Sequence, residues 1–289
     1  MRAGHASRTA RWVAGLRAAA AGLSGARAAA RDDVALSLLP RRVAALARRV
    51  RRGGTPGYLA LDALTLGLTS DVVLRTLRLD DVVTAGVVRG VRQIVLLGAG
   101  YDARAYRMEG VEQATFFEVD FPDTQADKRA RLAGHAARAR EVRHVGVDFL
   151  TQTIDAALLD AGLDRGAPSV FLWEGVTMYL PPDARRATIA AVARCAAPGS
   201  DLALTYSRRE DVSRPLLGFA HLASHAIGEP LDGYVTRAQL WRELDGEGFE
   251  EIEDSQGPDW ARRYWPTAPR LLDPVWERIA IARARSPLG

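Results

Sequence analysis

A glycine pair and three acidic residues each stand at the end of an apolar run, where side chains could bind a ligand. Gly98 and Gly100 end one run, and Asp120, Asp148 and Glu174 end three later ones. Glycines permit a tight turn and a close approach of the backbone to a ligand, and a carboxylate accepts hydrogen bonds from hydroxyl or ammonium groups. Such a set predicts a site for a nucleotide-like cofactor, in which Asp120 binds ribose hydroxyls.

The elements that would position these residues alternate between strands and helices. Short β-rich apolar runs predict seven strands, and amphipathic stretches between them predict helices. The strands are expected over 93–98, 114–120, 142–148, 169–175, 201–207, 248–255 and 277–284, and the helices over 123–138, 151–162, 182–197 and 236–247. We therefore expect an α/β fold with a doubly wound, mostly parallel, seven-stranded Rossmann-like sheet, whose carboxyl edge gathers the glycines and the acids.

The three acids have a second interpretation, as ordinary caps of the helices that follow the strands. Asp148 fits it best, because Thr151 follows soon after at the next helical stretch. Glu174 fits it poorly, because it lies within the apolar stretch FLWEGVTMYL, where a carboxylate without a partner is costly to bury. The pattern as a whole favours a cofactor crevice.

The glycine turn also indicates the kind of cofactor. It matches the loose pattern G-x-G-x-x-[G/A] of dinucleotide enzymes, whose pyrophosphate favours a neutral or basic turn. Here Asp102 lies inside the turn, and more carboxylates are expected in the crevice. This favours S-adenosylmethionine, which carries a sulfonium, an ammonium and only one carboxylate. An NAD(P)-dependent dehydrogenase is the less favoured alternative.

Four stretches, in order, resemble one enzyme family. LLGAGYDARAYRM, FFEVDFPDTQADKRARL, VGVDF and FLWEGVTMYLPPDARRAT resemble the leucine carboxyl methyltransferase and polyketide O-methyltransferase group of class I S-adenosylmethionine-dependent enzymes. The resemblance is dense over about residues 72–195 and weaker in both flanks. It implies that Gly98 and Gly100 hold the methionine part of the cofactor, that Asp120 holds the ribose, and that Asp148 and Phe149 flank the adenine.

The same resemblance implies roles at the amino-acid end of the cofactor. Glu174 would lie near the amino group. An arginine upstream of the glycine loop would pair with the carboxylate, and Arg75 in LRTLRLDD is the match, with Arg78 as the alternative. We count Asp102 among the cofactor-binding residues. Ala103 stands where many relatives have a threonine.

The composition excludes several other kinds of site. Lys128 is the only lysine and Cys195 the only cysteine, so a disulfide scaffold, a cysteine-built zinc site and a P-loop are excluded. Cys195 is expected to be a buried hydrophobe, and no metal site is predicted. The net charge of +4 is nearly all arginine, which we attribute to base composition. No apolar run reaches the ~20 residues that span a bilayer, and we expect a cytoplasmic protein without membrane contact.

Two parts are expected along the chain. Residues 1–90 would form an N-terminal helical extension or lid, and residues 91–289 the cofactor-binding domain, with a substrate-covering insertion near 208–235. The first 31 residues hold six arginines and no acid, as transit peptides do. We favour an amphipathic helix there, whose expected face is Trp12, Val13, Leu16, Ala19 and Ala20.

The expected reaction is O-methylation of a small-molecule carboxylate or hydroxyl. The six arginines of RRVAALARRVRR (41–52) leave a nucleic-acid methyltransferase as the alternative, although a solvated helix face is favoured. His221 and His225 are one helical turn apart, and a packed or solvated role is favoured over catalysis. No catalytic base and no oligomeric state are assigned.

Overall fold

The computed structural model describes residues 7–148, 152–211, 218, 224, 231, 233–268, 272 and 275–286. Seven strands form one sheet in the order β3-β2-β1-β4-β5-β7-β6. All neighbouring strands are parallel, except that β7 runs antiparallel to β5 and β6. The bounds are β1 Gln93–Leu97, β2 Thr115–Asp120, β3 Glu141–Gly146, β4 Ser169–Trp173, β5 Asp201–Tyr206, β6 Phe249–Gln256 and β7 Arg278–Ala284. The predicted fold class is confirmed.

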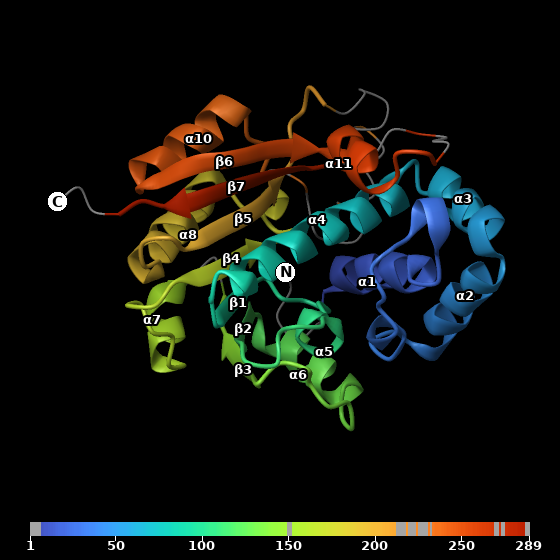
Figure 1. Ribbon diagram of the computed structural model, residues 1–289, viewed down its shortest axis with the longest axis horizontal. Helices are drawn as coiled ribbons and strands as arrows, with labels where there is room; N and C mark the ends of the chain where they lie inside the picture. The colour runs from blue at the N-terminus through green and yellow to red at the C-terminus, as the bar shows by residue number, and fades with distance from the viewer. Residues whose placement is uncertain are drawn as a thin grey trace.

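Four helices precede the sheet, and the others are distributed along it. The first four are α1 Arg8–Ala20, α2 Arg41–Arg52, α3 Gly54–Leu64 and α4 Leu68–Val88. The rest of those described are α5 Arg104–Arg107, α6 Pro122–Arg131, α7 Ile154–Asp160, α8 Pro182–Cys195, α10 Arg237–Gly246 and α11 Gly257–Tyr264. Figure 1 shows α1, α2 and α3 grouped at one end of the molecule, while α4 lies across the sheet.

Helices cover the sheet on both faces, because successive strand residues point to opposite sides. Ile94 and Leu96 of β1 join one core cluster, which contains α4 and α11. Val95 and Leu97 join the other, which contains α7, α8 and α10. Burial on both faces explains why the strands read as unbroken apolar runs. Cys195 is buried in the second cluster, as expected.

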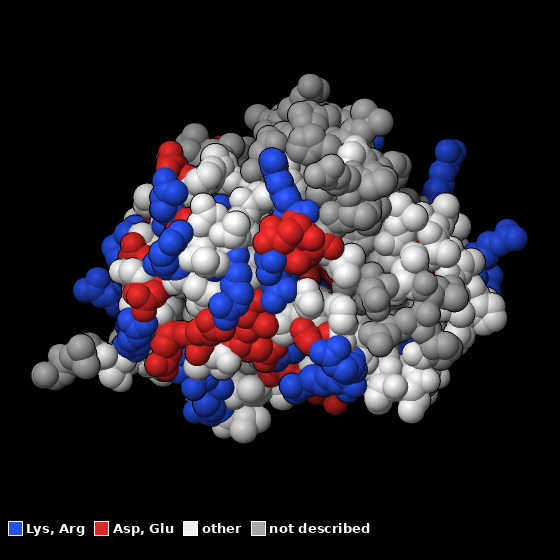
Figure 2. Space-filling view, turned by 90° about the horizontal axis from the view of Figure 1, so that it is seen from above, with Lys and Arg blue, Asp and Glu red and all other residues white. Residues whose placement is uncertain are grey.

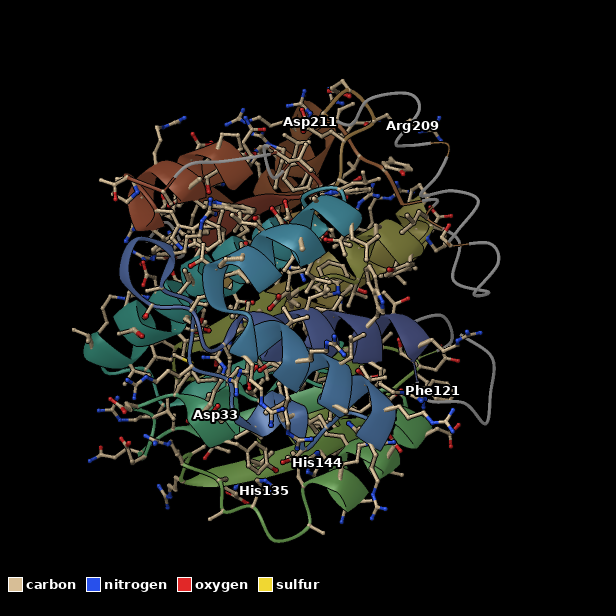
Figure 3. The ribbon with its side chains drawn as sticks, turned by 90° about the vertical axis from the view of Figure 1, so that its right-hand side faces the viewer. Asp33, Phe121, His135, His144, Arg209 and Asp211 are labelled. Carbon is tan, nitrogen blue, oxygen red and sulfur yellow. The ribbon has the colours of Figure 1, made fainter. Side chains whose placement is uncertain are left out.

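The N-terminal helices form a third core cluster, which reaches the loop after β1. Ala14 and Ala18 of α1 pack there with Tyr101 and Ala103. Seen from that end, these helices lie in front of the sheet (Figure 3). The division near residue 90 stays a prediction, and α4, which precedes it, also packs against β4 and β5.

Two local expectations are wrong. Trp12 is 51% exposed, so it does not belong to the buried face of α1, which is formed by Ala14, Leu16 and the alanines at its end. The helix expected over 123–138 ends at Arg131. Gly134, three residues later, has a left-handed backbone with φ of 91°, which prevents the helix from continuing.

Membrane-spanning potential among the described residues is confined to one bent pair of helices. No single described helix has the length and apolar character to cross a bilayer. The pair α3 and α4, which is bent by 110° at its break, is long and apolar enough when the two helices are counted together, by length and composition only. Twelve residues of α4 are buried in the protein.

Candidate functional site

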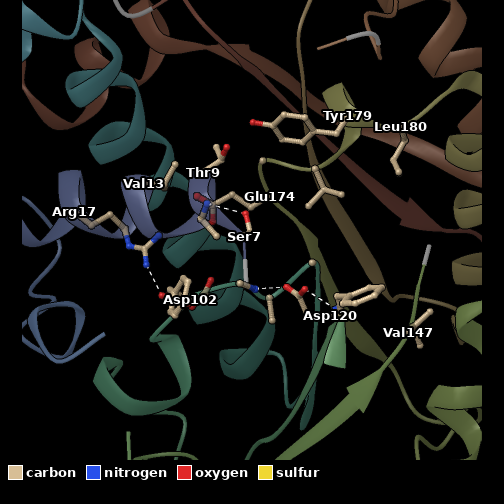
Figure 4. A pocket seen from close by; sticks show the side chains of 18 of the residues that line it. Ser7, Thr9, Val13, Arg17, Asp102, Asp120, Val147, Glu174, Tyr179 and Leu180 are labelled. Atoms are coloured by element: carbon tan, nitrogen blue, oxygen red, sulfur yellow. Dashed lines mark hydrogen bonds between the residues drawn. The ribbon is translucent and has the colours of Figure 1, made fainter. Parts of the chain in front are cut away.

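A cavity of about 230 Å³ opens at the carboxyl edge of the sheet, where β1, β2 and β4 end beside α1. Its walls come from six segments that are far apart in the sequence. In Figure 4, Val13 and Arg17 of α1 lie to the left, Asp120 lies to the right, and Glu174 lies between them. Predicted site residues that line it are Arg75, Gly98, Gly100, Asp102, Asp120, Asp148 and Glu174.

The glycine loop takes the form that its sequence predicts. Gly98 and Gly100 have φ of 69° and 45°, a region that other residues seldom adopt. A methyl group on Gly98 would lie 2.3 Å from Val176, and one on Gly100 would lie 3.1 Å from Ala10 of α1. Both glycines are therefore required by conformation and by close packing around the cavity.

Asp120, the last residue of β2, accepts hydrogen bonds from two backbone amides. Its Oδ2 accepts a hydrogen bond from the Gly100 amide at 2.5 Å, and its Oδ1 accepts one from the Phe121 amide at 2.6 Å. Burial raises the pKa of Asp120 to about 6, although these two hydrogen bonds act in the opposite direction. The carboxylate is thus anchored to the glycine loop and ionised at neutral pH.

Glu174 follows β4 and lies between two arginines. Its Oε1 accepts from Arg75 Nε at 2.9 Å, and its Oε2 accepts from Arg104 Nη1 at 2.8 Å. Burial alone would raise the pKa of Glu174, but the cations of Arg104, Arg75 and Arg17 outweigh burial and hold the pKa at about 2. The partner that the apolar surroundings of Glu174 require is therefore present.

The choice between the two predicted arginines is resolved by position. Arg75 of α4 lines the cavity. Arg78, one turn later, forms a bidentate pair with Glu253 of β6, at 3.0 and 2.6 Å. Arg75 is therefore the arginine that can reach a ligand, and its role toward a cofactor stays a prediction.

The remaining predicted residues differ in what the structure shows. Asp102 accepts from the Arg104 amide at 2.7 Å and pairs with the Arg104 guanidinium, which holds the pKa of Asp102 below its usual value despite burial. Asp148 lines the cavity. Phe149, His221 and His225 lie outside the described residues.

The described histidines lie away from this edge. His135 and His144 are at the β3 end of the molecule, opposite Arg209 and Asp211 (Figure 3). Across the residues that the structure describes, no group of three or more His, Cys, Asp or Glu side chains is arranged to hold a metal ion.

The sequence patterns did not predict that α1 forms a wall of the cavity. Arg17 is the main case: its Nη2 donates to the Tyr101 carbonyl at 2.6 Å and its Nε to Asp32 at 3.1 Å, so it ties α1 to the glycine loop. The cavity residues of α1 and its cap are Ser7, Thr9, Ala10, Val13 and Arg17. Ala10, Val13 and Arg17 fall at helical spacing, a signal that could have been used.

The lining charges suit a cationic ligand. Among the described lining residues, four carboxylates (Asp102, Asp120, Asp148 and Glu174) face two guanidinium groups (Arg17 and Arg75). S-Adenosylmethionine, with two positive groups and one carboxylate, complements this excess, whereas a pyrophosphate would be repelled by it. The residues present therefore fit the cofactor that the sequence predicts.

The comparisons with known proteins agree with this geometry. The leucine carboxyl methyltransferase family matches residues 10–193 of the chain. A protein of Frankia alni, named "Putative S-adenosyl-L-methionine-dependent methyltransferase", is 38% identical over 149 residues, which are 52% of this chain and 52% of that protein. A Streptomyces coelicolor protein of the same description is 39% identical over 149 residues, 52% of this chain and 53% of its own.

The chain spans about half the length of the curated relatives it matches. Among solved structures, a methyltransferase of Thermobifida fusca described as putative has a TM-score of 0.59 at 19% identity, with 94% of each chain covered. That similarity shows a shared fold. Because the family match runs from α1 into α8, over more than half of the residues, the protein belongs to the leucine carboxyl methyltransferase family.

Proposed function

We propose that this chain is an S-adenosylmethionine-dependent O-methyltransferase that acts on a carboxylate or hydroxyl group of a small molecule. The observation that carries the proposal is the pair of carboxylates at the ends of β2 and β4. Asp120 and Glu174 line one cavity and are held in different ways, which suits a ligand with a ribose at one end and an ammonium at the other. The names of the relatives support the same cofactor.

Different residues would bind different parts of the cofactor. Asp120 would accept hydrogen bonds from the ribose hydroxyls, and Glu174 would face the amino group. Arg75 and Arg17 would bind the carboxylate, a charge-assisted contact that arginine geometry favours. The cofactor supplies a methyl group on a sulfonium, a leaving group that needs no protonation. The protein's part is therefore to position the acceptor oxygen in line and to exclude water.

The choice of acceptor depends on whether a proton must be removed. Among the described carboxylates of the cavity, Asp102 and Glu174 are paired with arginines, and the pKa of each is lowered, so both are weak proton acceptors. Asp120, whose pKa is raised to about 6, would be engaged by the ribose. A carboxylate acceptor is already ionised at neutral pH and needs no base. This favours a carboxylate over a phenolic hydroxyl, whose pKa near 10 would call for a base.

Methyl transfer to a panel of acceptors tests the proposal. Purified protein is incubated with methyl-labelled S-adenosylmethionine and small carboxylic acids or phenols, and products are measured by mass. Gain of one methyl group on an oxygen is expected, and base-labile esters would identify carboxylate acceptors. Cofactor binding with transfer only to nitrogen or carbon would contradict O-methylation.

A nucleic-acid methyltransferase is the second candidate, because α2 presents arginines to solvent. Arg41, Arg42, Arg48, Arg49 and Arg52 are exposed, whereas Arg51 pairs with Asp33 at 2.8 Å. On another face, basic and acidic side chains interleave (Figure 2), which is unlike a single-sign binding surface. Steeply salt-dependent binding to tRNA or duplex DNA would favour this candidate.

A cytoplasmic location is part of the main proposal.

A further inference from the structure

Arg75 is held by a second glutamate that does not belong to the cavity. Its Nε donates to Glu174 Oε1 at 2.9 Å, and its Nη1 donates to Glu277 Oε2 at 2.5 Å. Glu277 directly precedes β7 and is separated from Arg75 by 202 residues along the chain. The side chains of Arg75 and Glu277 are 3% and 8% exposed, so this is a buried ion pair.

Glu277 is itself anchored to the helix that carries Arg75. Asp71 of α4 is fully buried, and its Oδ1 accepts hydrogen bonds from the amides of Trp276 and Glu277, at 3.2 and 3.4 Å. Burial first, and the nearby Glu277 second, raise the pKa of Asp71 to about 8. The segment before β7 is therefore clamped onto α4, one turn from Arg75.

These contacts determine where the remaining edge of the guanidinium points. The group is planar and its N–H donors are fixed relative to one another. With Nε directed to Glu174 and Nη1 to Glu277, Nη2 lies toward Gly175, where a methyl group on that glycine would be 3.9 Å away. Gly175 lines the cavity, whereas Glu277 is not among its lining residues.

We propose that Glu277 is a positioning residue that turns Nη2 of Arg75 toward the carboxylate of the cofactor's amino-acid part. This inference rests on the proposed function. Without Glu277, Arg75 could turn both terminal nitrogens to Glu174 and form a bidentate pair there, a strongly favoured geometry. Arg75 would then be withdrawn from the ligand, although Glu277 itself never touches it.

Two ligands separate positioning from a general structural role. S-Adenosylhomocysteine has the amino-acid end that Arg75 would bind, whereas 5′-methylthioadenosine has the same nucleoside without it. Affinities for both are measured by calorimetry on the full chain. In Glu277→Ala we expect the Kd for S-adenosylhomocysteine to rise about tenfold, a loss typical of one charge-assisted hydrogen bond, with the Kd for methylthioadenosine unchanged within twofold.

Glu253 offers a matched control, because it pairs with Arg78 on the next turn of α4 and lies outside the cavity. Glu253→Ala should leave the ratio of the two Kd values unchanged. Glu277→Gln keeps an oxygen that can accept from Nη1, so it should restore about half of the lost binding free energy. If Glu277→Ala does not fold, Glu277→Gln must still raise the Kd ratio by about threefold.

An unchanged Kd ratio in folded Glu277 variants, or an equal loss for both ligands, would overturn the positioning role. Failure of the unaltered protein to bind either ligand would instead overturn the proposed function.

Discussion

Two carboxylates at neighbouring edges of the same cavity are stabilised in opposite ways. Asp120 is held by two backbone amides, and burial raises its pKa to about 6. Glu174 is somewhat more exposed than Asp120, and arginines on both sides hold its pKa at about 2. The β2 end of the cavity therefore has a carboxylate whose pKa is raised to about 6, and the β4 end has one whose pKa is lowered to about 2.

The difference matches what each end would bind under the proposed function. A ribose offers neutral hydroxyl donors, so a carboxylate held by two backbone amides is sufficient at the β2 end. An ammonium and a carboxylate together require fixed charges of both signs, which the β4 end provides as Glu174 between Arg75 and Arg104. The two ends should consequently differ in how far their loss affects stability and binding.

The largest effect on folding is expected from Glu174→Ala. Removal of this carboxylate takes one partner from each of two buried arginines, although Arg75 keeps Glu277 and Arg104 keeps Asp80 and Asp102. The expected cost in the free energy of unfolding is therefore about 3 kcal/mol, at the lower end of the range for a broken buried pair. Urea denaturation measures this cost. Glu243→Ala is the matched control, because the Arg185–Glu243 pair is buried to the same degree but lies outside the cavity. It should destabilise the protein to a similar extent without changing cofactor affinity.

Asp120→Ala should affect binding more than folding. Loss of the hydrogen bonds to the ribose is expected to cost about 1.5–3 kcal/mol, which calorimetry with S-adenosylmethionine would detect as a much weaker Kd. Circular dichroism should show an intact fold. Unchanged affinity in a folded variant would disprove the assignment of Asp120 to the cofactor.

A smaller effect is expected from pH. Ribose hydroxyls bind an ionised carboxylate more strongly than a neutral carboxyl group, so affinity should be constant above the Asp120 pKa of about 6 and fall below it. Glu174 remains ionised over this range. S-Adenosylhomocysteine and methylthioadenosine should lose affinity in parallel between pH 7.5 and 5, and Asp120→Asn should remove this dependence.

The pKa shifts of Asp120 and Glu174 change the free energy of unfolding with pH in opposite directions. The raised pKa of Asp120 lowers the free energy of unfolding as pH rises from about 4 to 6. The lowered pKa of Glu174 contributes stability that is lost as pH falls from 4.5 toward 2. Acid titrations of Glu174→Gln and Asp120→Asn would separate the two contributions, and slopes of the same sign would contradict the comparison.

Much of the fold could be predicted because burial on both faces makes the central strands β1, β4 and β5 nearly continuous apolar runs. The ends of the predicted strands marked Asp120, Asp148 and Glu174, and parallel pairing brings such ends to one edge. The glycine loop was predictable for a similar local reason, since Gly98 and Gly100 have positive φ.

The contacts between distant segments could not be predicted in this way. Arg17 reaches the Tyr101 carbonyl across 84 residues of sequence, and Glu277 reaches Arg75 across 202. Neither lies at the end of a parallel strand, and both depend on how helices pack beside the sheet. An arginine-rich composition also hides which guanidinium groups are buried at a site, because most others lie at the surface.

Comparative thermal stabilisation by two ligands is the most direct test of the central claim, that this cavity is built for S-adenosylmethionine. A ligand present at 100 times its Kd adds about 2.7 kcal/mol to the stability of the folded state. S-Adenosylhomocysteine should raise the melting temperature of the unaltered protein, and NADH should not. Stabilisation by NADH alone would contradict the account, because it would mean that the cavity accepts a pyrophosphate in spite of its carboxylates.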